Sequence, residues 1–545
     1  DQITVFNLLK ACISVQSIIW ARLIHAEVLR RKLETTPSFG NMLVHMYVKC
    51  NNIDDAWKVF KRLPCPDIIS WGTIVSGCAI HQHNIQALGL FDEMQEKGIS
   101  PNTVVFLGIL KACMNLERLV MVMQSHHQIV RTGIASNVVL VSTLIDMYSK
   151  SGRLGEARYL FDKLPEKNVV SWGSIITGYV QHGHGVSALR LYEQMKQEGL
   201  KPDKFVLSSV FRACAKVKAS TQGSLVHIQV MFCKFRSDIV VGNSLIDMHA
   251  KCGNLETMRR VFHEMETKNA VSWGAVIAGY VQHNFCEVAL ELYMRMVQGG
   301  LKPDLLTFSC LVKACGIMGT LQEGRLLHGH IIRRGYGDDL ITGNALLDMY
   351  SKCGSLEDAE ILFDSLQYSD RVSWGAIIAG SVQHGKSHNA LELFSKMAKK
   401  GIEPDKITFL SLLKACGSIV AIQEGRLIHD QIIRKGLKSD VIVGNALIDM
   451  YIKCGSLEEA RAVFNKLDKR VVVSWGVMIS GYAQFERITC ALKLLCEMHS
   501  ENIEADNVTY LCILSACSKM GALKQGRLMH DQIIVNGLNM DLVVT

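Results

Sequence analysis

The chain repeats itself at a fixed interval of 101 residues, with no insertion or deletion between copies. The tripeptide Ser-Trp-Gly marks five of these copies, and its tryptophans are Trp71, Trp172, Trp273, Trp374 and Trp475. A second marker, which begins as LLKAC at 8–12 and ends as ILSAC at 513–517, keeps the same period. A length of 545 residues ordinarily suggests three or four globular domains, but self-similarity at a fixed period is typical of repeat architectures.

Each unit of 101 residues divides into three segments of 35, 35 and 31 residues, for example 169–203, 204–238 and 239–269. Each segment has the pattern of two helices. Leu447 and Tyr451 have helical spacing, and Ser456 with Glu459 has the spacing of a capping box, as has SLED at 355–358. A hairpin of about 35 residues cannot bury its apolar face alone, whereas stacked hairpins bury a continuous core. We therefore expect an all-α solenoid in which the repeated tryptophans fill equivalent packing sites between repeats.

Composition agrees with a buried core and restricts the partners. Hydrophobic residues make up 49% of the chain, and no apolar run approaches the roughly 18–20 residues of a membrane helix, so we expect a soluble protein without a membrane partner. The formal net charge of +8 permits a polyanionic partner without requiring one. The 18 cysteines include no Cys-x-x-Cys and recur in phase, which favours packing roles and a reduced compartment over metal binding. The two in-phase sets are Cys12, Cys113, Cys214, Cys315, Cys416 and Cys517, and Cys50, Cys252, Cys353 and Cys454.

Phrases such as TFLSLLKAC, EGRLIH and NALIDMYIKCGSLEEARAVF, together with the alternating segment lengths, resemble pentatricopeptide repeat (PPR) proteins of the plant organellar type, with P, L and S motifs. The resemblance covers essentially the whole chain and implies a right-handed α-solenoid (superhelix) of about 16 helix-turn-helix PPR motifs. The expected motifs are L 2–36, S 37–67, P 68–102, L 103–137, S 138–168, P 169–203, L 204–238, S 239–269, P 270–304, L 305–339, S 340–370, P 371–405, L 406–440, S 441–471, P 472–506, L 507–541 and a partial S 542–545.

The resemblance implies binding of single-stranded RNA, at about one base per repeat, read by two or three side chains. In this family the fifth and last residues of a motif face the base, and the second residue, usually Val or Ile, helps to sandwich it. The corresponding pairs in the S motifs are Asn41 with Asp67, Ser142 with Asn168, Asn243 with Asn269, Asn344 with Asp370, and Asn445 with Val471.

Hydrogen-bond chemistry supports a code at the last position. An Asp carboxylate only accepts hydrogen bonds, which suits the imino N–H of U or G, whereas an Asn amide donates to a ring nitrogen of A or C. By resemblance, Asn at the fifth position favours pyrimidines and Ser favours purines. The first four S motifs are then expected to select U, A, C or U, and U, and the fifth selects no base because Val471 cannot hydrogen-bond. The alternative is that these residues are only helix N-caps.

The P and L motifs depart from this pattern. The fifth residue of every P motif is glycine, so that base choice rests on the last residue and is expected to be loose. These last residues are Asn102, Asp203, Asp304, Asp405 and Asp506. The L motifs mostly carry apolar fifth residues and are expected to space the readers. Two exceptions that could favour G are Ser208 with Asp238 and Ser309 with Asp339.

One lysine recurs at the thirteenth position of every S motif, near the end of its first helix. The set is Lys49, Lys150, Lys251, Lys352 and Lys453. These lysines have two interpretations of similar weight, pairing with RNA phosphates or complementing the helix dipole.

No catalytic motif is expected in this chain. HSE at 499–501 matches half of a zinc deaminase signature, but no Cys pair follows and other copies of the repeat differ. We expect no cofactor and no small-molecule substrate. The resemblance implies a specificity factor for RNA processing in the mitochondrion or chloroplast, most specifically cytidine-to-uridine editing, with editing proteins acting in trans. The alternatives are a protein-binding scaffold, and an editing enzyme whose deaminase domain lies beyond Thr545, because both ends of the sequence interrupt the pattern.

Overall fold

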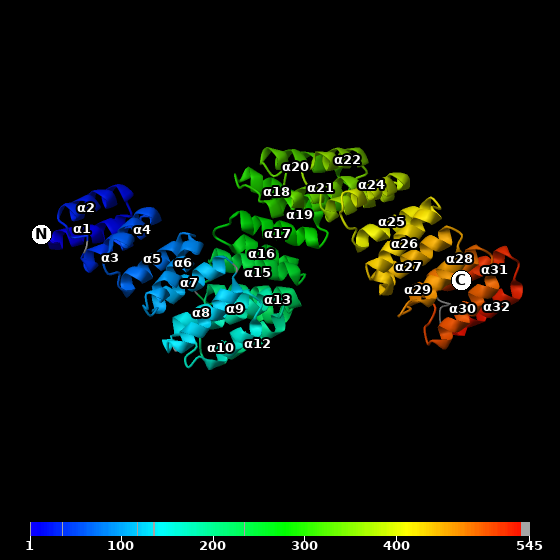
Figure 1. Ribbon diagram of the computed structural model, residues 1–545. Coiled ribbons are helices and arrows are strands. Elements are labelled where there is room, and N and C mark those ends of the chain that lie inside the picture. Colours follow the sequence, from blue (N-terminus) through cyan, green and yellow to red (C-terminus); the bar gives the residue numbers. More distant parts are fainter. Residues whose placement is uncertain (1, 35, 117, 135–136, 234, 536–545) are drawn as a thin grey trace. The chain divides into compact units, whose positions relative to one another are not determined.

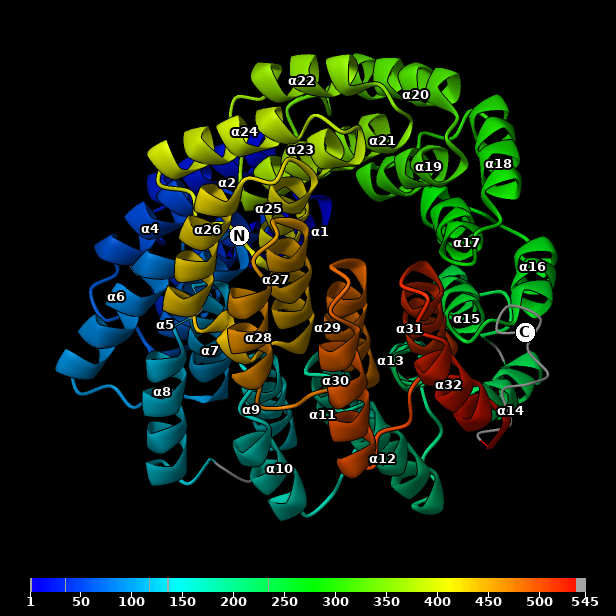
Figure 2. The ribbon, with the colours of Figure 1, turned by 90° about the vertical axis from the view of Figure 1, so that its right-hand side faces the viewer.

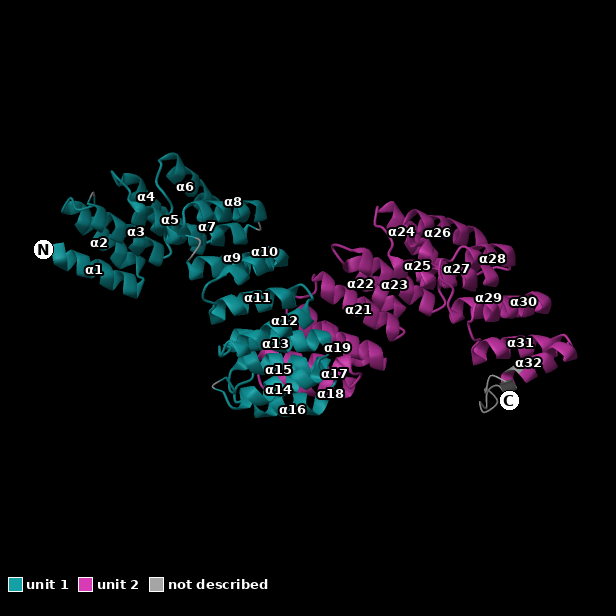
Figure 3. Ribbon diagram, turned by 90° about the horizontal axis from the view of Figure 1, so that it is seen from below, with its two compact units in different colours: residues 1–268 teal, residues 269–545 magenta. Residues whose placement is uncertain are grey.

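The computed structural model describes residues 2–34, 36–116, 118–134, 137–233 and 235–535. Within these residues the chain forms 32 α-helices and no β-strand (Figure 1). No described helix is long and apolar enough to cross a lipid bilayer. The chain divides into two compact units, residues 1–268 and 269–545 (Figure 3), and each is described by itself.

The sixteen helices of unit 1 are mostly 13 residues long, with shorter members of 10 residues. They are α1 (Gln2–Val15), α2 (Ile18–Arg30), α3 (Pro37–Lys49), α4 (Ile53–Arg62), α5 (Ile68–Ile80), α6 (Asn84–Glu96), α7 (Thr103–Asn115), α8 (Leu119–Arg131), α9 (Val138–Lys150), α10 (Leu154–Lys163), α11 (Val169–Gln181), α12 (Gly185–Gln197), α13 (Lys204–Val217), α14 (Ser220–Met231), α15 (Ile239–Lys251) and α16 (Leu255–Glu264).

Unit 2 continues the same alternation, with one short 3-10 turn at Leu437–Ser439. Its α-helices are α17 (Ala270–Gln282), α18 (Cys286–Gln298), α19 (Leu305–Met318), α20 (Leu321–Arg333), α21 (Leu340–Lys352), α22 (Leu356–Ser365), α23 (Arg371–Gln383), α24 (Ser387–Lys399), α25 (Lys406–Ser418), α26 (Ile422–Arg434), α27 (Val441–Lys453), α28 (Leu457–Asn465), α29 (Val472–Gln484), α30 (Ile488–Ser500), α31 (Asn507–Lys519) and α32 (Leu523–Val535).

Odd-numbered and even-numbered helices form two layers within each unit. Each odd helix packs against its even partner and against the next odd helix. In unit 2, for example, α20, α22 and α24 lie outside α19, α21 and α23 (Figure 2). The odd helices are buried on several sides, as the apolar sequence of α5 requires, whereas even helices such as α8 bury one stripe. The fold is the expected all-α solenoid of stacked helical hairpins.

The repeated tryptophans occupy equivalent packing sites. Trp71, Trp172, Trp374 and Trp475 are at most 2% exposed, and each packs edge-on against a phenylalanine of the preceding even helix. The ring centroids of these Trp–Phe pairs lie between 4.6 and 4.8 Å apart. Trp273, near the start of unit 2, is only partly buried against the core of that unit. The expected equivalence is therefore confirmed for Trp71, Trp172, Trp374 and Trp475.

The prediction of capping boxes at Ser355 and Ser456 is wrong in detail. Both serines are N-caps, but neither side chain accepts a backbone hydrogen bond. Each hydroxyl donates instead to the carboxylate of Asp358 or Glu459. True capping boxes stand at the start of α5, α11, α17 and α23, where an Asp or Asn N-cap pairs with a serine three residues later.

The cysteines are free thiols with packing roles. The members of the first in-phase set are all buried, and those of the second are half-buried. In unit 2, Cys454 Sγ donates to the carbonyl of Cys416 at 3.7 Å, so the two sets meet. Burial raises the pKa of the Cys416 thiol to about 12, which keeps it protonated and unreactive.

A histidine and a tyrosine join an even helix to the next odd helix at four places. The ring nitrogen and the hydroxyl lie 2.8–3.0 Å apart in His25–Tyr47, His126–Tyr148, His328–Tyr350 and His429–Tyr451. At the fifth place His249 contacts His227 at 3.1 Å instead. Burial lowers the pKa of His126, His328 and His429, and that of His249 to about 4. The folded chain therefore opposes protonation of these rings.

We expect acid to destabilise the protein before its carboxylates titrate. Between the unfolded histidine pKa of about 6.5 and the lowered folded values, the unfolded chain binds more protons, so stability falls as pH drops. Urea unfolding followed by circular dichroism at pH 7, 6 and 5 should show a falling midpoint. The double variant His328→Asn and His429→Asn should show a weaker pH dependence, and an equal dependence in both proteins would contradict this assignment.

Candidate nucleic-acid interface

One face of the odd helices carries a row of exposed apolar side chains. The second, fifth, ninth and thirteenth residues of a helix lie within about 80° of one another around its axis. The second residue is a large apolar one, between 39% and 71% exposed, in every odd helix except α3, which has Ser38. The row consists of Ile3, Ile69, Val104, Val139, Val170, Phe205, Val240, Val271, Leu306, Ile341, Val372, Ile407, Ile442, Val473 and Val508. Single exposed apolar residues are common, but a row in one phase marks a contact surface.

The fifth residue of an odd helix lies beside the N-cap of the next odd helix. Asn41 Nδ2 donates to both carboxylate oxygens of Asp67, at 3.1 and 3.0 Å, and Asn344 Nδ2 donates to Asp370 at 3.2 Å. The amide oxygen of each Asn accepts from the serine of the capping box, Ser70 or Ser373. Two of the expected pairs are therefore assembled by direct hydrogen bonds.

The last residues of the expected pairs are side-chain N-caps, with the exception of Val471, and their contact with a base stays a prediction. In Asp67, one carboxylate oxygen accepts from the N–H groups of Ile69 and Ser70. Partial burial opposes ionisation of Asp67, but hydrogen bonds from Ser70 and Asn41 outweigh it and lower the pKa of the carboxyl. The carboxylate of Asp67 is thus ionised at neutral pH. The capping N–H groups donate to only one of its two oxygens, Oδ1.

In the other expected pairs within one unit, the described structure has no hydrogen bond between the fifth residue and the last residue of the motif. Ser142 Oγ, Ser309 Oγ and Asn445 Oδ1, all at fifth positions, are buried and have no hydrogen-bond partner in the described part of the chain. Ser208 contacts Ser244 at 2.6 Å, and the second oxygen of Asp238 accepts from Lys204 at 3.3 Å. Buried polar atoms without a partner are unfavourable, and a ligand group would satisfy them. Asn243 belongs to unit 1 and Asn269 to unit 2.

The glycine at the fifth position of α17, α23 and α29 has a steric reason that the sequence did not reveal. A Cβ at Gly274 would lie 2.6 Å from the hydroxyl of Thr307, and Gly375 and Gly476 face Thr408 and Thr509 at 3.1 and 3.0 Å. Each hydroxyl also donates to the N-cap aspartate of its own helix, as Thr307 does to Asp304 at 2.6 Å. The threonine thus fills the place of a fifth side chain. The caps of α7, α13, α19, α25 and α31 are Asn102, Asp203, Asp304, Asp405 and Asp506.

Four of the five recurrent lysines are ion-paired within their own helix. Each is the last residue of its helix and contacts the aspartate one turn earlier. The pairs are Lys150–Asp146 at 2.7 Å, Lys251–Asp247 at 2.8 Å, Lys352–Asp348 at 2.6 Å and Lys453–Asp449 at 2.7 Å. The fifth lysine, Lys49, has His45 and not an aspartate one turn earlier in its helix. The role of these lysines in phosphate binding stays a prediction.

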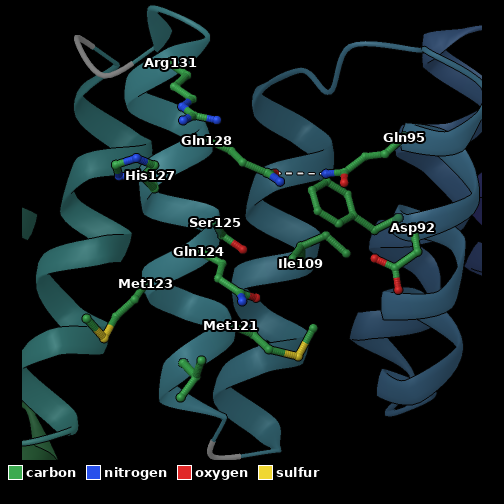
Figure 4. Close-up of a pocket in the computed structure, with 12 residues that line it drawn as sticks. Asp92, Gln95, Ile109, Met121, Met123, Gln124, Ser125, His127, Gln128 and Arg131 are labelled. Atoms are coloured by element: carbon green, nitrogen blue, oxygen red, sulfur yellow. Dashed lines mark hydrogen bonds between the residues drawn. The ribbon is translucent and has the colours of Figure 1, made fainter.

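A groove on the even-helix layer differs from the candidate interface in its side chains. It lies between α6 and α8 and is lined by Met121, Met123 and Phe91 (Figure 4). Gln95 Nε2 of α6 donates to the amide oxygen of Gln128 of α8 at 2.9 Å (Figure 4). This groove lacks the fifth-position and N-cap pairs that define the candidate interface. In the described residues, no group of three or more His, Cys, Asp or Glu is arranged to hold a metal ion.

Comparison with known families matches the repeats directly. The PPR repeat family model matches residues 66–115, 167–216, 268–316, 369–418 and 470–519. A second PPR repeat model matches residues 41–65, 139–169, 243–269, 344–370 and 445–470. These matches cover more than half of the chain, and the protein belongs to the pentatricopeptide repeat family.

Curated relatives from Arabidopsis thaliana extend over nearly the whole chain. A mitochondrial PPR-containing protein is 34% identical over 541 residues, which span 95% of this chain and 60% of the relative. A chloroplastic one is 34% identical over 495 residues, spanning 91% of this chain and 80% of the relative. The chain thus spans about three fifths of the length of the first relative. The names of these relatives support the expected organellar location.

Solved structures confirm the fold. The crystal structure of PPR10 from maize superposes with a TM-score of 0.63 at 19% identity, covering 99% of this chain and 90% of that one. PPR10 in complex with an 18-nt psaJ RNA element gives a TM-score of 0.50 at the same identity.

Proposed function

We propose that this chain binds single-stranded RNA in a sequence-specific manner, at about one base per repeat. The observation that carries the proposal is the coincidence, on one helix face, of the exposed second-position row with the fifth-position and N-cap groups. Asn41 with Asp67 and Asn344 with Asp370 are the assembled examples. An apolar residue from successive repeats would cover the flat faces of a base, and the polar groups would contact its edge. The existence of an RNA complex of PPR10, a member of the same family, supports RNA binding.

The proposal extends to the organisation of the repeats. We assign the chain to the PLS subclass, with the motif boundaries expected from the sequence. The shortening of every third even helix to 9 or 10 residues supports a period of three repeats. In this scheme the S motifs discriminate best, the P motifs select through their last residue, and the lysines at the thirteenth position lie near the strand. The biological role would be that of a specificity factor in organellar RNA processing, and specifically in cytidine-to-uridine editing, with catalysis supplied by another domain or protein.

Direct binding tests the proposal. The purified chain is titrated with a single-stranded RNA, its duplex with the complementary strand, and a single-stranded DNA of the same sequence. We expect the single-stranded RNA to bind most tightly, because base edges and faces are accessible only in the unpaired strand. Failure to bind any of the three would overturn the proposal and favour the protein-scaffold alternative.

A change at Val471 should create a new site. Val471 precedes α29 without a side-chain cap, and its partner Asn445 has a buried, unpaired amide oxygen. Val471→Asp would reproduce the arrangement of Asn344 with Asp370, so we expect about 1 kcal/mol of added stability from the new cap and a new preference for U at this repeat. Thermal unfolding and RNA titration measure the two effects, with Val471→Ala as the control that gains neither. Equal results for the two variants would refute the equivalence.

A further inference from the structure

The ninth residue of the odd helices alternates in charge with a period of three helices. It is a cation in α1, α7, α13, α19 and α25, an anion in α9, α15, α21 and α27, and a small residue in α5, α11, α17, α23 and α29. The pattern is broken in α3, which has His45, and in α31, which has Ser515. The cations are Lys10, Lys111, Arg212, Lys313 and Lys414. They lie in the L motifs, most of which have an apolar fifth residue and are expected to act as spacers, although Arg212 and Lys313 lie in the two motifs that carry Ser208 and Ser309.

These cations share the face of the candidate interface. Seven residues separate the second and ninth positions, which is two turns of helix or about 10 Å along the axis, at nearly the same angle. All five side chains are exposed. In these helices, therefore, the ninth-position cation lies about two helical turns from the exposed apolar second residue of the same helix, against which a base would stack.

The pairing state of these charges distinguishes them from the lysines at the thirteenth position. Four of those lysines contact a carboxylate at 2.6–2.8 Å, so a phosphate would have to compete with an existing ion pair. Among the described residues, none of the five ninth-position cations has a carboxylate within ion-pair distance, and Lys10 contacts only the ring of Phe6, at 4.9 Å. An unpaired surface cation binds a phosphate without giving up a protein partner and releases condensed counterions from the RNA.

We propose that Lys10, Lys111, Arg212, Lys313 and Lys414 bind the phosphates of the RNA backbone, one contact in every three repeats. The inference rests on the proposed function and adds to it a role for the L motifs, which hold the strand while the S motifs discriminate bases. The lysines at the thirteenth position contribute less to the salt dependence of binding, because their charge is compensated within the helix.

Two double variants in unit 2 test the proposal with equal losses of charge. K313Q/K414Q removes two ninth-position cations, and K352Q/K453Q removes two ion-paired lysines. All four residues are exposed, and circular dichroism establishes that both variants are folded. Affinity for one single-stranded RNA is measured from 50 to 300 mM KCl. Each lost phosphate contact should lower the slope of log affinity against log salt by about 0.7, so K313Q/K414Q should lose about 1.4 and K352Q/K453Q less than half of that.

Three outcomes are distinguishable. A slope of K313Q/K414Q equal to that of the wild type overturns the inference while leaving RNA binding intact. An equal fall of the slope in both variants also overturns it, because the ion pairs would then make no difference. If the wild-type chain binds no single-stranded RNA, the proposed function fails and the inference fails with it. The charge-retaining variant K313R/K414R is expected to keep the wild-type slope.

Discussion

Replacing Trp172 with alanine is expected to lower the free energy of unfolding by about 3–5 kcal/mol, the range for buried large aromatic residues. Trp172 is 1% exposed, and its ring packs edge-on against Phe161 at 4.6 Å, where α10 meets α11. The truncation leaves a cavity between two repeats. Helices could fill this cavity only by shifting, which would disturb their packing against the next repeat. Because each repeat contacts only its neighbours, the loss should be confined to the repeats around α11.

Urea unfolding followed by circular dichroism measures this effect, and native-state hydrogen exchange locates it. The matched control is Trp20→Ala, since the Trp20 side chain is 60% exposed and its removal should change stability by no more than about 0.5 kcal/mol. Equal destabilisation by the two substitutions would contradict the packing role assigned to the repeated tryptophan.

The double substitution Ser142→Asn and Asn168→Asp is expected to move the base preference of one repeat from A to U by about 1–3 kcal/mol. It would convert the pair at 138–168 into the pair found at 340–370. The new carboxylate, ionised and anchored as the N-cap of α11, accepts an imino N–H and offers no donor to adenine. The asparagine would hold the carboxylate as Asn344 holds Asp370 at 3.2 Å.

The measurement is a titration of both proteins against RNAs that differ at one nucleotide. The nucleotide assigned to 340–370 is the internal control, and its preference should stay the same because each repeat contacts its own base. If both proteins keep the same order of preference at the altered site, the residues at 142 and 168 act only as structural caps.

Much of the fold followed from the sequence, because a fixed period admits only an architecture of stacked identical units. The two helices of each segment and the burial of Trp172 were predicted from spacing and residue type, and N-capping by Asp67 and Asp370 was the alternative interpretation of these residues. These features depend on local geometry, which is repeated unchanged in each copy.

The parts that could not be predicted depend on contacts between neighbouring repeats. Glycine at 274 was interpreted as the loss of a reader, whereas the hydroxyl of Thr307 already occupies that space from the next helix. Ser456 was expected to cap α28 through a reciprocal pair, but Glu459 is also held by Arg426 from α26 at 2.9 Å, a partner 33 residues away. Spacing within one segment contains no information about such partners.

Selection of RNA from a random single-stranded pool by the wild-type chain tests the central claim most directly. If each repeat contacts one base, the S motifs from 37–67 to 340–370 lie three bases apart. The recovered RNAs should then carry U, A, a pyrimidine and U at every third nucleotide, with weaker preferences between them. Recovery of RNAs without this spacing, or of no RNA, would contradict the account.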